Sequence, residues 1–183
     1  LDPILPVIRT DKEKTKLIVN RSIVLNDEGK TLQLNPHQTK LYNLLTNRTN
    51  KLELIINKKH PSFSVSIDSV KAKYKLLTTD KQKPVIKWDI QLSGILEESE
   101  THVSSENLEQ LTKVVSKELQ KWIVEFLAIL QENKADPLGF GLRYKATTVH
   151  NRDTFKEWEQ DIYPKLTYDV KVKVEIKSTG IIE

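Results

Sequence analysis

The sequence predicts an α+β domain in which an antiparallel β-sheet carries a long amphipathic helix and shorter helices on one face. Five segments alternate apolar and polar residues with the period of two that a half-buried strand requires. After residue 103 the period changes to threes and fours, which is the spacing of one face of a helix. Short connections and polar second faces favour antiparallel pairing of the strands.

The composition is that of a globular domain large enough to bury a core. The chain has 183 residues, of which 38% are hydrophobic and 30% charged, and this balance is not that of a disordered polymer. The absence of cysteine excludes disulfides, thiolate metal sites and cysteine nucleophiles. No apolar run approaches the roughly 20 residues of a membrane-spanning helix. The formal net charge of +4 indicates only a weak preference for acidic partners.

Two parts of the chain differ in character. Residues 1–15 combine two prolines with a run of charges, which indicates a linker arriving from a preceding domain. Residues 16–183 are expected to form a single α+β C-terminal domain. Because the chain contains no methionine, we interpret it as a fragment of a longer protein.

The first half of the chain alternates through four expected strands. They cover residues 17–25, 51–59, 61–77 and 85–96. Residues 26–29 form a turn, and Asn35 can cap a short helix that has Pro36 at its first position. In the third strand the apolar positions change from odd to even, which places a β-bulge near Asp68 and Ser69.

The second half begins with a helix of about 28 residues, which Ser104 can cap. A wide apolar stripe runs from Leu108 to Leu130, and we expect Trp122 and Phe126 to be among the most buried residues. A shorter helix at about 151–162 follows, and a strictly alternating strand covers 168–176.

The stretch KADPLGFGLRYK, residues 134–145, holds two of the five glycines of the chain. A dinucleotide-binding loop needs a third glycine between a strand and a helix, but Tyr144 takes that place and the stretch follows a helix. We therefore predict a packing corner, where Asp136 caps and Pro137 starts a short helix. One of the two glycines, Gly139 or Gly141, would allow the backbone of the long helix to approach closely, and the other would allow the helix that carries Trp158 to do so.

The titratable side chains suggest no catalytic or metal-binding arrangement. The four histidines have no metal-ligand spacing and are interpreted as surface residues. The serines have no activating neighbour that the sequence identifies. We therefore expect no catalytic residue, no metal and no nucleotide or other cofactor, and a hydrolase of unknown type is the least favoured alternative.

Two rows of lysines are the sharpest surface feature. The first consists of Lys71, Lys73 and Lys75, and the second of Lys171, Lys173 and Lys177. Together they could form a basic face for anionic lipid or polymer surfaces. The pattern favours the alternative, an ordinary solvated sheet face or an edge strand protected by lysine. Interleaved aromatic residues, on which single-stranded nucleic acids stack, are not evident, so no nucleic acid partner is expected.

Three motifs of the second half occur together in a known family. After the long helix come the corner KADPLGFGLRYK, the segment FKEWEQDIYPKL and the final strand YDVKVKVEIKSTGII. In this order they resemble the C-terminal domain of spore germination receptor C subunits, the GerAC-like or Ger(x)C lipoproteins. The residues that match the family motif are Asp136, Gly139, Gly141, Trp158 and Gly180. The first half is similar as well, although Asn20 and Asn35 stand where the family often has glycine.

The resemblance implies properties that composition and spacing do not show. It implies a multidomain parent lipoprotein, tethered by lipid to the outer face of the spore inner membrane. It implies integral membrane partners, the A and B subunits of a nutrient germinant receptor, and no catalytic activity. The function expected from it is an interaction or scaffold domain in spore germination. The alternative is an electrostatic binding module that uses the lysine rows.

Overall fold

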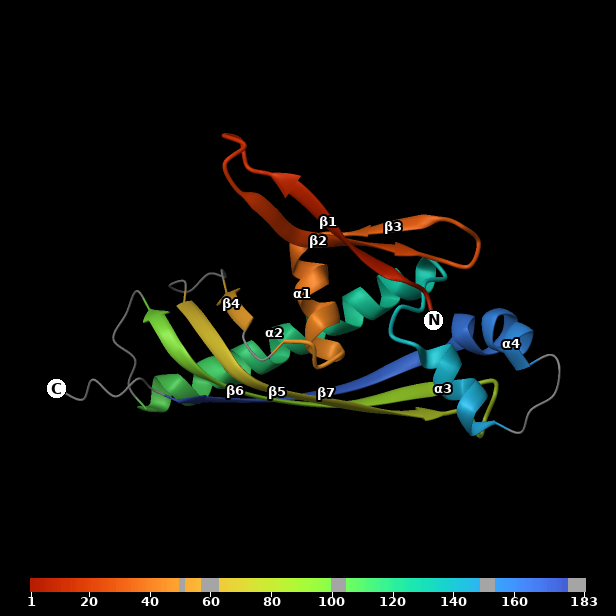
Figure 1. Ribbon diagram of the computed structural model, residues 1–183. Helices are drawn as coiled ribbons and strands as arrows, with labels where there is room; N and C mark the ends of the chain where they lie inside the picture. The colour runs from red at the N-terminus through yellow and green to blue at the C-terminus, as the bar shows by residue number, and fades with distance from the viewer. Residues whose placement is uncertain (50–51, 57–62, 100–104, 149–153, 178–183) are drawn as a thin grey trace.

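The computed structural model describes residues 1–49, 52–56, 63–99, 105–148 and 154–177. These residues form a three-stranded sheet in the order β1–β2–β3 and a four-stranded sheet in the order β4–β5–β6–β7. Helices α1 and α2 lie between the two sheets (Figure 1). The α+β class is confirmed, but the single sheet expected from the alternation is two sheets.

The three-stranded sheet is an antiparallel arrangement at the start of the chain. Strands β1 (Ile4–Thr10), β2 (Leu17–Leu25) and β3 (Thr31–Leu34) pair in sequence order. Residues 4–10, expected within a linker, are therefore part of a sheet. Pro6 is compatible with this place because β1 is an edge strand, where a missing N–H need not break the ladder.

Helix α1 (Pro36–Leu45) begins as the sequence predicts. Asn35 accepts a hydrogen bond from the N–H of Gln38, whose side chain accepts one from the N–H of Asn35, so both form a capping box. Beyond the helix, Asn47 exchanges two hydrogen bonds of 2.8 and 2.9 Å with the backbone of Ala72. This side chain therefore replaces a neighbouring strand at that point on the edge of β5.

The four-stranded sheet is mixed. Its strands are β4 (Leu52–Ile56), β5 (Phe63–Leu77), β6 (Val85–Ser99) and β7 (Thr167–Lys177). The first three pair antiparallel as expected, whereas β7 runs parallel to β6. The expectation of a purely antiparallel sheet is wrong there, because the helices between β6 and β7 form a crossover that carries the chain back.

The predicted bulge in β5 is present, with a register shift between Ile67 and Ser69. Opposite it, Gly94 of β6 lies so close that a Cβ would stand 2.3 Å from the carbonyl oxygen of Ser66. Only glycine fits at this approach of the two backbones. The sequence pattern identified the bulge but not the glycine that accommodates it.

Helix α2 (Ser105–Glu132) has 28 residues and packs along β7. Phe126 is 1% exposed, as predicted. Trp122 is only partly buried, with its ring edge-on to that of His37 at 4.6 Å, so the expectation for this residue is wrong. Trp122 stands on the border of the apolar stripe, where sequence does not decide burial. The expected cap Ser104 lies outside the described residues.

The connection from α2 to β7 consists of short helical pieces. They are α3 (Phe140–Thr147), α4 (Thr154–Glu157), the π-helical turn η1 (Trp158–Ile162) and the 3₁₀ turn η2 (Tyr163–Lys165). In the described residues, the helix expected at about 151–162 is thus a single α-helical turn that continues as a π-helical turn from Trp158. Within the described residues, no helix has the length and apolarity to cross a membrane.

Replacement of Phe126 by alanine tests whether α2 covers the core. We expect Phe126→Ala to lower the free energy of unfolding by about 3–5 kcal/mol, through lost burial and a residual cavity. Chemical denaturation followed by circular dichroism measures it. Val124→Ala is the matched control on the same helix, 36% exposed, and should change stability by no more than about 0.5 kcal/mol. Equal effects of the two would contradict the assigned face.

Candidate functional site

The corner between α2 and α3 is organised by the buried carboxylate of Asp136. Its Oδ1 accepts a hydrogen bond from the N–H of Phe140 at 2.9 Å, and its Oδ2 accepts one from the N–H of Gly141 at 2.7 Å. The N–H of Asp136 donates to the carboxylate of Asp2 at 2.7 Å. The first turn of α3 and the start of the chain are therefore both fixed by one residue.

The start of α3 differs from the sequence expectation. The helix begins at Phe140 and not at Pro137, and its N-cap is Gly139, which has a φ of 75°. This left-handed conformation favours glycine. A Cβ at Gly139 would approach Leu1 at 3.2 Å, so the predicted contact with the long helix is wrong. Asp136 does cap the first turn, but from a position before the N-cap residue.

Gly141 has a different role, because it allows Trp158 to pack against the backbone. A Cβ at Gly141 would lie 2.7 Å from Nε1 of Trp158 and 3.3 Å from Oδ2 of Asp136. This is the close approach that the sequence suggested for one of the two glycines. Trp158, 2% exposed, stacks on the ring of Tyr163 with centroids 5.4 Å apart. The Tyr163 hydroxyl donates to the carbonyl of Ala135 at 2.6 Å, which closes the corner.

Burial controls the protonation of the corner. Loss of solvent raises the pKa of Asp136 to about 6, although its two backbone hydrogen bonds favour the charged form. Burial also raises the pKa of Asp2 and of Tyr163. The pKa of Glu159 is raised by burial and by the nearby carboxylate of Asp27. Acidic groups thus lie close together here at a cost in electrostatic energy.

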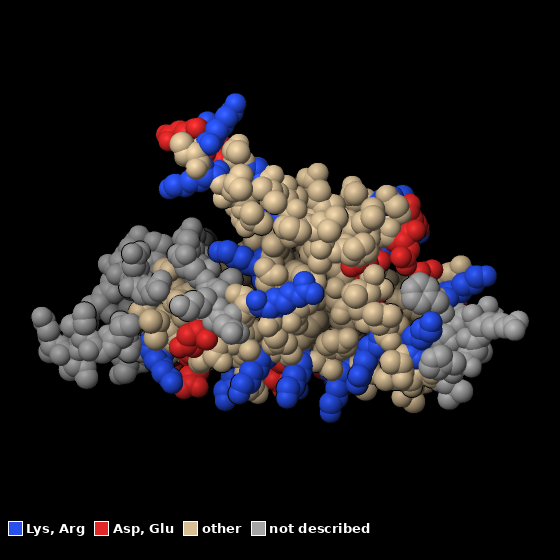
Figure 2. Space-filling view, viewed as in Figure 1, with Lys and Arg blue, Asp and Glu red and all other residues tan. Residues whose placement is uncertain are grey.

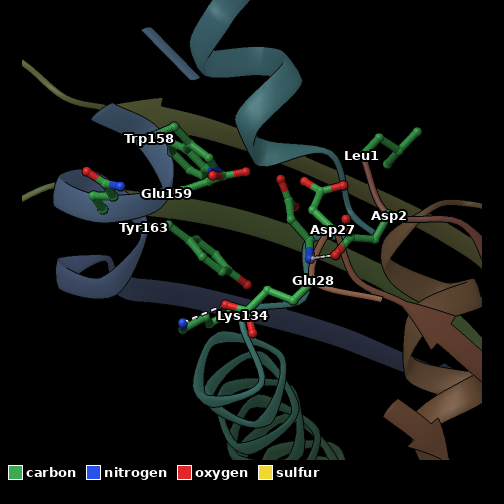
Figure 3. Close-up of a pocket in the computed structure, with 10 residues that line it drawn as sticks. Leu1, Asp2, Asp27, Glu28, Lys134, Trp158, Glu159 and Tyr163 are labelled. Carbon is green, nitrogen blue, oxygen red and sulfur yellow. Dashed lines mark hydrogen bonds and ion pairs between the residues drawn. The ribbon is translucent and has the colours of Figure 1, made fainter. Parts of the chain in front are cut away.

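A cavity of about 300 Å³ opens beside the corner (Figure 3). Carboxylates of Asp27, Glu28 and Glu159 line it, together with Lys134 and the aromatic ring of Trp158. Its volume is at the lower end for small-molecule sites. Among the residues that the structure describes, no group of three or more acidic or histidine side chains could hold a metal ion.

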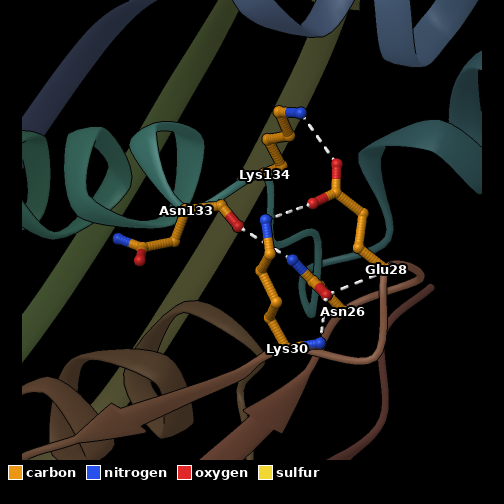
Figure 4. Close-up of polar contacts among 5 residues, drawn as sticks. All are labelled: Asn26, Glu28, Lys30, Asn133 and Lys134. Carbon is orange, nitrogen blue, oxygen red and sulfur yellow. Dashed lines mark hydrogen bonds and ion pairs between the residues drawn. The ribbon is translucent and has the colours of Figure 1, made fainter.

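A polar cluster joins the β2–β3 turn to the end of α2 (Figure 4). The side-chain amide of Asn26 donates to the carbonyl of Asn133 at 3.1 Å, across 107 residues of sequence. Glu28 forms ion pairs of 2.7 Å with Lys134 and with Lys30. The hydrogen bonds from these lysines lower the pKa of Glu28 to about 2. The sequence predicted the turn but gave no sign of its distant partner.

The structure brings the two lysine rows onto one face of the four-stranded sheet. The lysines of β5 and those of β7 stand in register on either side of β6, and all are exposed. β6 contributes Lys87 to the same face, which the sequence analysis missed although it shares the outward parity of its strand. Gly180 lies outside the described residues, as do His60, His102 and His150.

The contact of Gly141 with Trp158 can be tested by a double-mutant cycle. We expect Gly141→Ala to lower stability by about 1–3 kcal/mol through overpacking, and Trp158→Ala to lower it by about 3–5 kcal/mol. In the double variant the alanine methyl occupies space left by the indole, so the loss should be smaller than the sum. Thermal and denaturant unfolding measure all three, and strict additivity would show that the two residues do not interact.

The buried carboxylate predicts a pH dependence with a defined sign. Since folding raises the pKa of Asp136 from 3.8 to about 6, its contribution to stability is complete below pH 3.8 and is lost as the pH rises through 6. Asp136→Asn should flatten the melting temperature across this window and lower it overall, because one N–H loses its acceptor. Asp161→Asn, which removes an exposed carboxylate, is the control for the change of net charge. An unaltered slope in Asp136→Asn would contradict the assignment.

Comparisons with known proteins extend this description. The family model described as "Spore germination B3/ GerAC like, C-terminal" matches residues 20–180. The crystal structure of the GerBC protein has the same fold, with a TM-score of 0.78 and 18% sequence identity over 96% of this chain. The chain spans 56% of the length of that GerBC chain. A search of curated proteins gives no match. Because the family match includes the corner, Trp158 and the last strand, this chain belongs to the spore germination B3/GerAC-like family and corresponds to its C-terminal domain.

Proposed function

We propose that this domain is a non-catalytic interaction and scaffold domain of a nutrient germinant receptor subunit that acts in spore germination. Membership of the GerAC-like family and the fold shared with GerBC support a role in germination. The contacts of the corner support the scaffold role.

The observation that carries the proposal is how the polar atoms of the corner are used. Both oxygens of Asp136 accept hydrogen bonds from the backbone of α3, and the Tyr163 hydroxyl donates to backbone as well. Gly139 supplies a left-handed turn and Gly141 a packing surface for Trp158. These residues therefore shape the domain and hold its elements together, and a ligand would have to displace internal contacts to engage them.

Membership of the family supports the proposed partners. The parent protein would be a lipoprotein held by its lipid at the outer face of the spore inner membrane. There it would assemble with the A and B membrane subunits of the receptor. In this arrangement the domain contributes a rigid body whose surface contacts other subunits, and it needs no cofactor.

Substitution in the parent protein distinguishes scaffold from ligand site. We expect Trp158→Ala or Gly141→Ala to lower the amount of receptor in spores and to reduce germination with every nutrient that this receptor serves. Immunoblots of spore membranes and germination assays with single nutrients measure the two effects. Val124→Ala serves as the matched control and should leave both unchanged. Normal receptor levels with loss of response to one nutrient would make the corner a ligand site and refute the proposal.

Affinity capture tests the proposed partners. The tagged parent protein, purified from detergent-solubilised spore membranes, should retain the A and B subunits, identified by mass spectrometry. The Trp158→Ala variant should retain less of each, when the amounts are normalised to captured parent protein. Capture of neither subunit with the unaltered protein would remove the assembly role.

A further inference from the structure

The outer face of the four-stranded sheet carries a concentration of lysines (Figure 2). We call it the basic face and define it by three lysines on β5, one on β6 and two on β7. They are Lys71, Lys73, Lys75, Lys87, Lys171 and Lys173. Their inward neighbours along the strands, such as Trp88, Ile90 and Val170, are buried under the helices, so the alternation of each strand directs the lysines to solvent.

The register shows how the charges are distributed. Residues that are neighbours across the strands form three rows, each with one residue from β5, one from β6 and one from β7. These cross-strand rows are Lys71, Gln91 and Lys173; Lys73, Asp89 and Lys171; and Lys75, Lys87 and Asp169. The six lysines face only two carboxylates in these rows. Among the described residues, the ion pairs involve other lysines, and none includes a member of the basic face. The two aspartates offset part of the charge, and the rows keep an excess of positive charge, six lysines against two carboxylates.

Protection of a sheet edge accounts for the lysines of β7 and for those of β5 beyond its pairing with β4, but not for Lys87. Lysines on edge strands prevent unwanted strand pairing, but β6 lies between β5 and β7 and has no free edge along this region. Lys87 of β6 stands between Lys75 and Asp169, so the repulsion from Lys75, which destabilises a sheet, is offset only in part. A solvated face with no other role would not need to keep that repulsion. An anionic partner would relieve it.

The shape and chemistry of the face indicate the kind of partner. The lysines border a shallow groove of about 610 Å³, which Arg143 of α3 also lines. Successive outward-facing residues on one strand are roughly 7 Å apart, and adjacent strands are about 5 Å apart. The lysines therefore form a two-dimensional array, which suits contact with several separate anions at once. The three rows contain only lysine, glutamine and aspartate. Protein interfaces centre on aromatic and apolar anchors and are depleted in lysine, which disfavours an acidic polypeptide.

We propose that the basic face docks onto the phosphate headgroups of anionic lipids at the surface of a bilayer. Lysines near an anionic lipid surface each strengthen binding by about fivefold, and their flexible stems adapt to laterally mobile headgroups. This inference does not depend on the scaffold role, since the corner and the basic face are formed by different residues.

Vesicle co-sedimentation of the 183-residue chain tests the proposal. Vesicles of phosphatidylcholine with an equal part of phosphatidylglycerol should bind the chain, whereas vesicles of phosphatidylcholine alone should not. Binding should weaken steeply as salt is added, because exposed charges are screened. The triple variant Lys73→Gln, Lys75→Gln, Lys87→Gln should bind about a hundredfold more weakly, as expected from about fivefold for each lysine.

A matched variant separates the face from total charge. Lys12, Lys14 and Lys16 are exposed at the far end of the β1–β2 hairpin (Figure 1), and their replacement by glutamine removes the same charge. This control should bind nearly as well as the unaltered chain. Melting temperatures provide a second readout, since Lys87→Gln removes both the repulsion from Lys75 and the attraction to Asp169 and should leave the melting temperature nearly unchanged.

Three outcomes would overturn the proposal. One is absence of binding to the anionic vesicles, and a second is equal loss of binding in the two triple variants. The third is tight binding of polyglutamate by the basic face without binding of vesicles, which would assign the face to an acidic polypeptide. None of them bears on receptor assembly, so failure here and failure of the scaffold role are distinguishable.

Discussion

The burial of one carboxylate, that of Asp136, is the constraint on which the second half of this structure depends. A charged group away from solvent is costly unless hydrogen bonds satisfy it, and here two N–H groups of the next helix do so. These bonds fix the direction in which α3 leaves α2. Position 141 also requires glycine, since a Cβ there would overlap Trp158 and crowd the carboxylate of Asp136. One electrostatic requirement thus determines the backbone geometry and the packing of the corner.

The corner in turn determines where β7 lies. Gln131, near the end of α2, donates to the carbonyls of Tyr163 and Leu166, which positions the turn before the strand. Thr167 then donates its N–H to the carbonyl of Pro84, immediately before β6, so the two strands begin side by side and run parallel. Parallel pairing in this register places the lysines of β7 level with those of β5. The basic face is therefore a consequence of the crossover that the corner initiates.

Local patterns predicted the features that local forces determine. The helix cap at Asn35, the length of α2 and the bulge in β5 depend on neighbouring residues, and all three are found. Strand direction leaves no trace in alternation, so the parallel pairing of β7 was not predictable. The φ of Gly139 and the partial exposure of Trp122 depend on tertiary neighbours. At the candidate sites, sequence indicated the two lysine rows, but the contribution of Lys87 became evident only from the register of β6.

The buried Asp136 and the opposed Lys75 and Lys87 are both electrostatically unfavourable, and they differ in what offsets them. The buried Asp136 is offset internally by hydrogen bonds, so its cost is the consequence of a corner that the fold needs. The opposition of Lys75 and Lys87 is offset only in part, by Asp169 on the other side of Lys87. Like charges on neighbouring strands lower the stability of the sheet. When no interaction inside the domain fully offsets such a cost, an interaction with another molecule is the place to look for the benefit. By this argument we assign the corner to folding and propose recognition for the basic face.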